Sequence, residues 1–117
     1  MISNRIELSK SKIKKEVINR ISETTDTNLR FLSRIGEPNK DPFAFFNELQ
    51  IDIKDAVNFI RSLTIEDYQY TQYDVKNKYQ YMHIFYKQIS TKIAYIKIGF
   101  NSDKTIVISF HEKMFEN

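Results

Sequence analysis

The spacing of apolar residues along the chain changes near residue 67. Before this point apolar residues recur every three or four positions, which is the spacing of amphipathic helices. Beyond it, runs rich in Tyr, Ile, Val and Phe alternate apolar and polar positions and favour a pleated sheet. The pattern predicts an α+β fold class, with N-terminal helices packed on an antiparallel β-sheet.

The first predicted helix spans residues 9–23. Its apolar residues recur at four-residue intervals, at Ile13, Val17 and Ile21. Ser9 or Ser11 is placed to cap it, and Glu16 precedes Arg20 by the spacing that favours an ion pair. Lysines at positions 10, 12, 14 and 15 could contact nucleic acid, but a charge run on an amphipathic helix is usually a solvated face.

Two shorter helices are predicted between residues 41 and 63. Asp41 can accept the free amide groups of a first turn, and Pro42 at the first helical position loses no hydrogen bond. The buried stripe expected in this helix is Phe43, Phe46 and Leu49. Asp52 is expected to cap the next helix, whose expected buried residues are Ile53, Val57, Ile60 and Leu63.

Four strands are predicted in the second half, over residues 68–75, 79–89, 93–100 and 105–111. Short polar links join them, so we expect consecutive strands to pair as an antiparallel meander. An earlier segment, residues 29–34, could form an edge strand or the start of a turn. The length of 117 residues predicts a single domain over residues 1–117.

The composition of the chain excludes some kinds of site and limits the partners to be expected. The chain has no cysteine, which excludes disulfides and thiolate sites, and its two histidines argue against a histidine zinc site, so no metal or cofactor is expected. The net charge of +3 is compatible with a polyanionic partner. No apolar run approaches the roughly 20 residues that span a bilayer, and MISNRIELSK has no apolar signal core, so we expect a cytoplasmic protein without a membrane partner.

The register of the last two hairpins predicts which side chains share a face. Pairing Asn101 with Thr105 places large aliphatic residues on one face, in the pairs Ile98 with Ile108 and Ile96 with Phe110. The other face then receives Tyr95 opposite His111 and Lys97 opposite Ser109, with Lys113 beyond. A turn at residues 90–91 adds Tyr86 beside Tyr95 and Met82 beside Gly99, and sends His83 inward as a satisfied core or boundary histidine.

The predicted polar and aromatic face suits RNA. Aromatic rings stack on unpaired bases and cations contact phosphates. RNA cleavage without a metal needs a group that removes the 2′-hydroxyl proton, a cation that stabilises the charged phosphorane and an acid for the leaving oxygen. His111, Lys97 or Lys113, and Tyr95 could supply these in some order, with Tyr70 and Tyr86 holding bases. Tyr and Lys are also ordinary residues on a solvated sheet face, and a histidine at a strand end is more often a surface residue.

The run from Leu49 to Lys113, LQIDIKDAVNFIRSLTIEDY followed by AYIKI and VISFHEK, resembles the MqsR family of bacterial toxin ribonucleases. The resemblance implies a RelE-like fold, metal-independent endonucleolytic cleavage of messenger RNA, growth arrest, and neutralisation by a cognate antitoxin protein. It also implies that the family's sheet-face tyrosine falls on Tyr95, and that its basic residue in the last strand falls on His111.

The sequence departs from this family at three positions. Members typically carry a lysine shortly after the Glu-Asp element, whereas here Asp67 is followed by Tyr68, Gln69 and Tyr70. A glutamine of some members falls near Met82, which we therefore include among the expected RNA contacts, and an arginine falls near Tyr86. We hypothesise that Lys97 and Lys113 compensate for the lost charge. The alternative is an inactive module on the same fold that binds RNA or a protein, and a structural role through an exposed strand edge also remains open.

Overall fold

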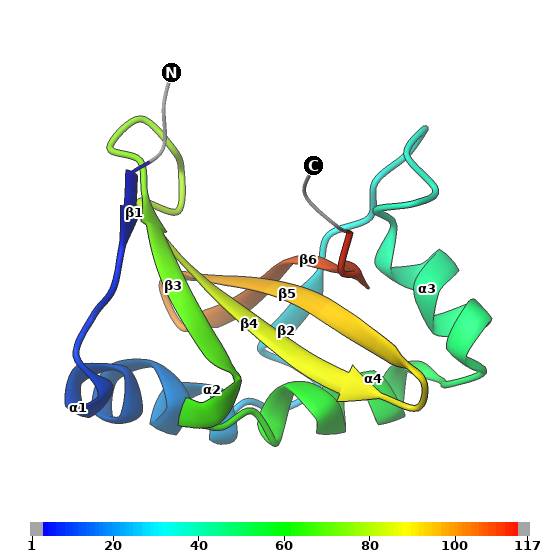
Figure 1. Ribbon diagram of the computed structural model, residues 1–117, viewed down its shortest axis with the longest axis horizontal. Coiled ribbons are helices and arrows are strands. Elements are labelled where there is room, and N and C mark those ends of the chain that lie inside the picture. Colours follow the sequence, from blue (N-terminus) through cyan, green and yellow to red (C-terminus); the bar gives the residue numbers. More distant parts are fainter. Residues whose placement is uncertain (1–3, 115–117) are drawn as a thin grey trace.

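The computed structural model describes residues 4–114, and these form an α+β fold, as predicted. Figure 1 shows the helical segments and a six-stranded sheet of order β1-β3-β4-β5-β6-β2. The helical elements are α1 (Lys10–Ile13), η1 (Lys14–Ile18), α2 (Asn19–Ser22), α3 (Pro42–Leu49), α4 (Ile53–Arg61) and η2 (Ile65–Asp67). The strands are β1 (Asn4–Ile6), β2 (Leu29–Phe31), β3 (Tyr68–Tyr73), β4 (Tyr81–Ile89), β5 (Lys92–Asn101) and β6 (Lys104–Glu112).

The sheet is mixed, which corrects the prediction of an antiparallel sheet. Strands β3 to β6 do form the predicted antiparallel meander. Residues 29–34 could have formed an edge strand or a turn. They contain the edge strand β2, which pairs in parallel with β6. Strand β1 pairs antiparallel with β3 at the other edge. Both edge strands have three residues, which is too short for an alternating pattern to reveal them.

The N-terminal helix is continuous from α1 through η1 to α2, and its middle element is a π-helix. Ser9 caps it by accepting the backbone N–H of Lys12 at 3.2 Å. The predicted stripe of Ile13, Val17 and Ile21 is buried. An α-helix has about 3.6 residues per turn, so a strict four-residue spacing would drift around it; the wider π turn keeps these side chains on one face.

The expected ion pair between Glu16 and Arg20 is not the one that forms. Glu16 instead lies 3.9 Å from Lys12, one turn earlier. The guanidinium of Arg20 donates to the backbone carbonyl of Ser102 and lies 4.1 Å from the ring centre of Phe100. Arg20 therefore fastens the helix to the β5–β6 turn, a contact between residues distant in sequence.

Both short helices begin where predicted. Asp41 accepts the backbone N–H of Ala44 at 3.0 Å, and Asp52 forms a reciprocal capping box with Asp55. Their buried stripes differ in part, because Phe43 is 43% exposed and Ile53 is 52% exposed. Phe46 is buried as predicted, and Phe45 is buried in place of Phe43. Their ring centres lie 5.0 Å and 6.0 Å from that of Phe110, so α3 docks on β6 through these two rings.

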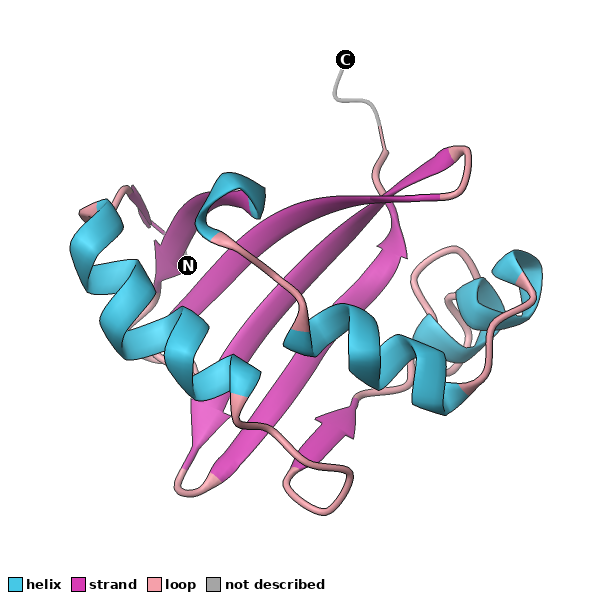
Figure 2. Cartoon of the chain, turned by 90° about the horizontal axis from the view of Figure 1, so that it is seen from below, coloured by secondary structure: helices cyan, strands magenta, loops and turns pink. Residues whose placement is uncertain are grey.

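The helices cover one face of the sheet, here called the inner face, as Figure 2 shows. Buried residues from the helices and from this face form one apolar cluster, which includes Ile13, Phe46, Ile60, Phe85 and Phe110. None of the helices that residues 4–114 form is long and apolar enough to cross a membrane. Burial of the inner face leaves the opposite, outer face for polar chemistry.

A β-bulge in β6 corrects the predicted register of the last hairpin. Asn101 pairs with Lys104 rather than Thr105, and Ile98 faces Val107 rather than Ile108. Ile108 is the extra residue, and it joins a small outer-face cluster with Met82 and Ile106. Beyond the bulge the predicted pairs form, including Ile96 with Phe110.

Gly99 lies in the outer-face cluster, beneath the side chain of Tyr79. A Cβ atom at this position would lie 2.8 Å from the Cβ atom of Tyr79 and 3.1 Å from the Ile108 side chain. Only glycine leaves room for this contact. Tyr79 thereby closes one end of the outer face with apolar packing.

Candidate nucleic-acid interface

Three rings form a row across the outer face, one from each of β4, β5 and β6. Tyr95 lies directly opposite His111, and Tyr86 lies opposite Tyr95, as predicted. The rings of Tyr95 and His111 are stacked, with centres 5.1 Å apart and planes 17° from parallel. The Tyr86 and Tyr95 ring centres are 6.1 Å apart. The phenol and the imidazole therefore stand side by side, each partly exposed.

Two lysines flank this row. Lys97 lies opposite Ser109, on the side of the row toward the bulge. Lys113 follows β6 on the other side, where its ammonium group lies 5.2 Å from the ring centre of Tyr86. Both lysines named in the sequence prediction thus border the row of rings, on opposite sides.

Tyr70 extends the aromatic row onto β3. A register irregularity separates it from Tyr68, and Tyr70 pairs with Ile84 on the outer face. It acts on the Tyr95 side chain, whose pKa it helps to raise. The guanidinium of Arg5, on β1, lies 4.3 Å from the Tyr70 ring centre. Four strands and the edge strand β1 therefore contribute to one aromatic and basic surface, which we call the outer-face patch (Arg5, Tyr70, Tyr86, Tyr95, Lys97, His111 and Lys113).

Met82 does not belong to the outer-face patch, contrary to prediction. It is 4% exposed and packs with Ile106 and Ile108 under the partly buried Leu32 and Tyr79. Its side chain has almost no surface to offer a base. The two-residue alternation placed it on the correct face, but it could not show that apolar side chains close this end.

Burial governs the acidity of Tyr95. Removal of its hydroxyl from water raises the pKa of Tyr95 well above its usual value of 10.0, and the neighbouring Tyr70 and Tyr86 raise it further. The phenol is therefore neutral at physiological pH. In this state it donates and accepts hydrogen bonds but carries no negative charge toward a phosphate.

His111 is set up as a neutral base. Burial lowers the pKa of its imidazole below 6.5, the positive charges of Arg34, Lys40 and Lys97 lower it further, and the backbone contact with Glu112 opposes them. That contact, 2.9 Å long, joins Nδ1 to the Glu112 carbonyl oxygen, which can only accept a hydrogen bond. Nδ1 must therefore carry the proton, and Nε2 keeps a free lone pair.

Lys97 is a weaker base than an ordinary lysine. Burial lowers its pKa from 10.5, and the nearby charges of Arg34 and Lys40 lower it further. Its ammonium form consequently gives up a proton more readily than a surface lysine. Lys97 can therefore act as a cation beside a phosphate or as a proton donor.

Sequence reasoning missed three cations at this surface. Arg34 and Lys40 lie between β2 and α3 and act electrostatically on both Lys97 and His111. The Arg34 side chain donates to the hydroxyl of Ser109 at 3.4 Å, and its backbone N–H donates to the Asp41 carboxylate at 3.0 Å. Arg5 is the third. Loop residues carry no periodic signal, and the parallel pairing of β2 that brings Arg34 here is non-local.

No protein-family model, curated protein sequence or solved structure matches this chain significantly. Among residues 4–114, no group of three His, Asp or Glu side chains is arranged to hold a metal ion. The outer-face patch, which combines aromatic rings, cations and a neutral histidine, is the candidate functional site.

Proposed function

We propose that this chain is an mRNA endoribonuclease that cuts single-stranded RNA without a metal, as the toxin of a bacterial type II toxin–antitoxin pair. In this proposal it acts in the cytoplasm, has a RelE-like fold of the MqsR type, and is neutralised by a cognate antitoxin protein. The observation that carries the proposal is the neutral His111, with a free Nε2 lone pair, stacked on Tyr95 among several cations.

The chemistry follows from the protonation states. His111 Nε2 removes the proton from a ribose 2′-hydroxyl, and the resulting oxygen attacks the adjacent phosphorus atom. The bond from phosphorus to the 5′-oxygen of the next nucleotide breaks, leaving a 2′,3′-cyclic phosphate. The departing 5′-oxygen takes a proton from the Lys97 ammonium group, which also balances the charge that builds up on the phosphorane.

The other members of the outer-face patch bind and orient the RNA. Tyr70 on β3 and Tyr86 on β4 offer ring faces beside Tyr95 for stacking of unpaired bases. The Tyr95 hydroxyl, held neutral, donates a hydrogen bond to a phosphate oxygen. Lys113 and Arg34 supply positive charge at the two ends of the row.

The direct test is incubation of the pure protein with RNA in EDTA. We expect fragments with 2′,3′-cyclic phosphate and 5′-hydroxyl ends, and a rate lower by a factor of about 10² to 10⁴ in His111→Ala. Lys97→Ala should also lose activity, whereas Lys87→Ala, which removes a lysine of the inner face paired with Asp67, should not. Full activity of His111→Ala, or a requirement for magnesium, would refute the scheme.

A second candidate is an RNA-binding module that has lost the chemistry. It is favoured by the segment after Asp67, where no lysine reaches the outer-face patch. Tyr68 turns inward, with its ring centre 5.8 Å from that of Phe85, and the Gln69 side chain donates to the Asp67 carbonyl. RNA binding without cleavage in the same assay, and no growth arrest on expression, would select this candidate.

A further inference from the structure

A second site lies on the helix side of the sheet, away from the outer-face patch. A cleft of about 540 Å³ opens between the N-terminal helix and the β3–β4 connection. Leu8, Val17 and Phe100 give it apolar walls, and His83 lies among its lining residues. The volume is in the range typical of small-molecule sites. The proposed RNA chemistry uses none of these residues.

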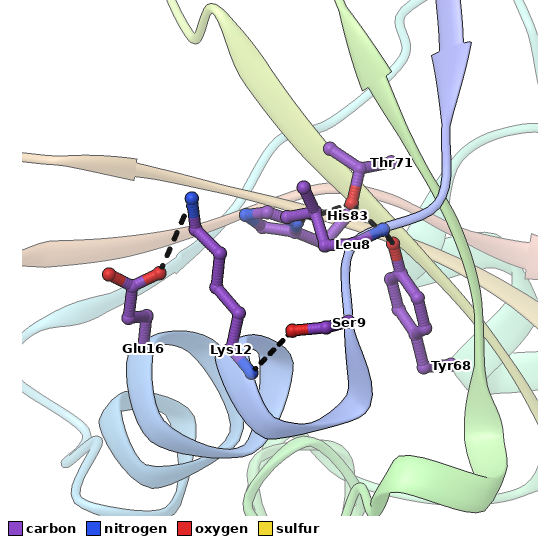
Figure 3. Close-up of polar contacts among 7 residues, drawn as sticks. All are labelled: Leu8, Ser9, Lys12, Glu16, Tyr68, Thr71 and His83. Carbon is purple, nitrogen blue, oxygen red and sulfur yellow. Dashed lines mark hydrogen bonds and ion pairs between the residues drawn. The ribbon is translucent and has the colours of Figure 1, made fainter.

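A chain of hydrogen bonds fixes what His83 presents to this cleft (Figure 3). The backbone N–H of Leu8 donates to the Tyr68 hydroxyl at 3.3 Å. The Tyr68 hydroxyl lies 2.7 Å from the Thr71 hydroxyl, which lies 2.9 Å from His83 Nδ1. The single Thr71 proton can go to Nδ1 or to Tyr68. If Thr71 instead accepted from both neighbours, its own buried proton would have no acceptor among these contacts.

Only one direction uses every proton. If Tyr68 donates to Thr71 and Thr71 donates to Nδ1, each hydroxyl proton has an acceptor. In the reverse direction the Tyr68 hydroxyl accepts from both Leu8 and Thr71, and its own proton has no acceptor among the hydrogen bonds of the described residues. Because half-buried donors are usually satisfied, Nδ1 accepts and Nε2 carries the proton. His83 therefore points an N–H donor away from Thr71, toward the side where Lys12 and Glu16 project (Figure 3).

The charges around the cleft favour an anion. Lys12, Lys78 and Glu16 line it, and burial lowers the pKa of His83 to about 4, so the imidazole is neutral and the charged lining residues sum to one positive charge. Lys12 and Glu16 are only 3.9 Å apart at their closest, with side chains 56% and 61% exposed. Such a surface pair is weak, so an incoming anion can replace Glu16 as the partner of Lys12.

We propose that this cleft binds a small carboxylate with an apolar body. One carboxylate oxygen accepts the Nε2–H of His83, the Lys12 ammonium group pairs with the same carboxylate, and the apolar part of the ligand packs against Val17 and Phe100. A carboxylate fits because His83 offers an N–H donor and the charged residues that line the cleft carry a net positive charge. An apolar body fits because Leu8, Val17 and Phe100 line the cleft beside these polar groups.

The test uses benzoate as the probe and benzamide, its neutral isostere, as the control, with binding followed by NMR titration of the whole chain. We expect benzoate to shift the His83 Nε2–H resonance with a millimolar Kd, and benzamide to bind much more weakly. Lys12→Gln should weaken benzoate binding by about fivefold, as expected for loss of a charge-assisted contact. Lys14→Gln, on the same helix but outside the cleft, should leave it unchanged.

Glu16→Gln is the most informative variant, because it removes the carboxylate that competes with the ligand for Lys12. We expect this variant to bind benzoate as tightly as the unmodified chain or more tightly. Equal binding of benzamide and benzoate, an unshifted His83 resonance, or a His83 tautomer protonated at Nδ1 would each overturn the proposal.

Discussion

Acidification should destabilise this fold through His83. The side chain is 5% exposed, lies on the inner face of β4, and hydrogen-bonds to Thr71. Its ring centre lies 6.1 Å from that of Phe100. Burial lowers its pKa from 6.5 to about 4, because a charged imidazolium at this position would lose its hydration without gaining an anionic partner.

The sign and size of the effect follow from proton linkage. Between pH 6.5 and about 4 the unfolded chain binds a proton at His83 that the folded chain does not. Stability is therefore complete above pH 6.5, falls as the pH is lowered, and loses no more from this residue below pH 4. One pH unit corresponds to about 1.4 kcal/mol, so the full loss from His83 is about 3 kcal/mol at 25 °C.

Urea denaturation at pH 7 and at pH 4 measures this loss. The matched control is His83→Asn, whose side-chain oxygen can take the place of Nδ1 as the acceptor for Thr71 but does not titrate. The variant will be less stable at both pH values because it leaves a cavity. Its stability should nevertheless fall by about 3 kcal/mol less than that of the unmodified chain between the two pH values.

The comparison isolates His83 because carboxylates and His111 titrate in both proteins and cancel in the difference. Equal losses in the two proteins would refute the reasoning, since they would mean that His83 binds its proton in the folded state nearly as readily as in the unfolded chain.

Four further outcomes are expected. Gly99→Ala should lower the free energy of unfolding by about 1–3 kcal/mol in urea titration, because its methyl group would overlap Tyr79; an unchanged stability would contradict this packing. Asp52→Ala should lower it by about 1 kcal/mol through loss of the α4 cap. Arg34→Gln should weaken RNA binding and reduce its salt-dependence slope by about one, measured by fluorescence anisotropy. The RNA cleavage rate should rise with pH with a midpoint below 6.5, because the pKa of His111 is lowered and only the neutral imidazole accepts a proton; a midpoint above 6.5 would exclude His111 as the base.

The pairing of the three outer-face rings could be predicted from sequence because two constraints agree. A two-residue turn at Ser90 and Thr91 fixes the register of β4 against β5, and it pairs Tyr86 with Tyr95. Apolar alternation then fixes the faces. Ser90 adopts a positive φ of 58°, which this tight turn requires.

The bulge could not be predicted, because the residues around it show no alternation between apolar and polar side chains. Ile106, Val107 and Ile108 are all apolar, so either neighbour can face inward without a visible break in the pattern. The prediction paired Asn101 with Thr105, one residue out at the turn, and the bulge then restored the predicted pairs from Lys97 with Ser109 onward. The predicted pairing of Tyr95 with His111 therefore forms, although the predicted register at the hairpin end was wrong.

The positions of the cations that come from outside β5 and β6 depend on contacts between segments distant in sequence. Arg34 reaches Ser109 only because β2 pairs in parallel with β6, and Arg5 reaches Tyr70 only because β1 pairs with β3. In neither pair are the two strands joined by a short turn, so the sequence carries no local signal for the pairing. The exposure of Phe43 has a similar origin, because the docking of α3 on Phe110 decides which of its rings is buried.

The bulge also determines where on the sheet the candidate chemistry lies. The extra residue adds the Ile108 side chain to the outer face, where it packs with Met82 and Ile106 beneath Tyr79. This packing closes the end of the outer face nearest the β5–β6 turn. Beyond the bulge the face is open, and Tyr95, Lys97 and His111 lie there half-buried. Partial burial next to an apolar cluster lowers the pKa values of Lys97 and His111 while the groups stay accessible, and a proton-transfer site needs both properties.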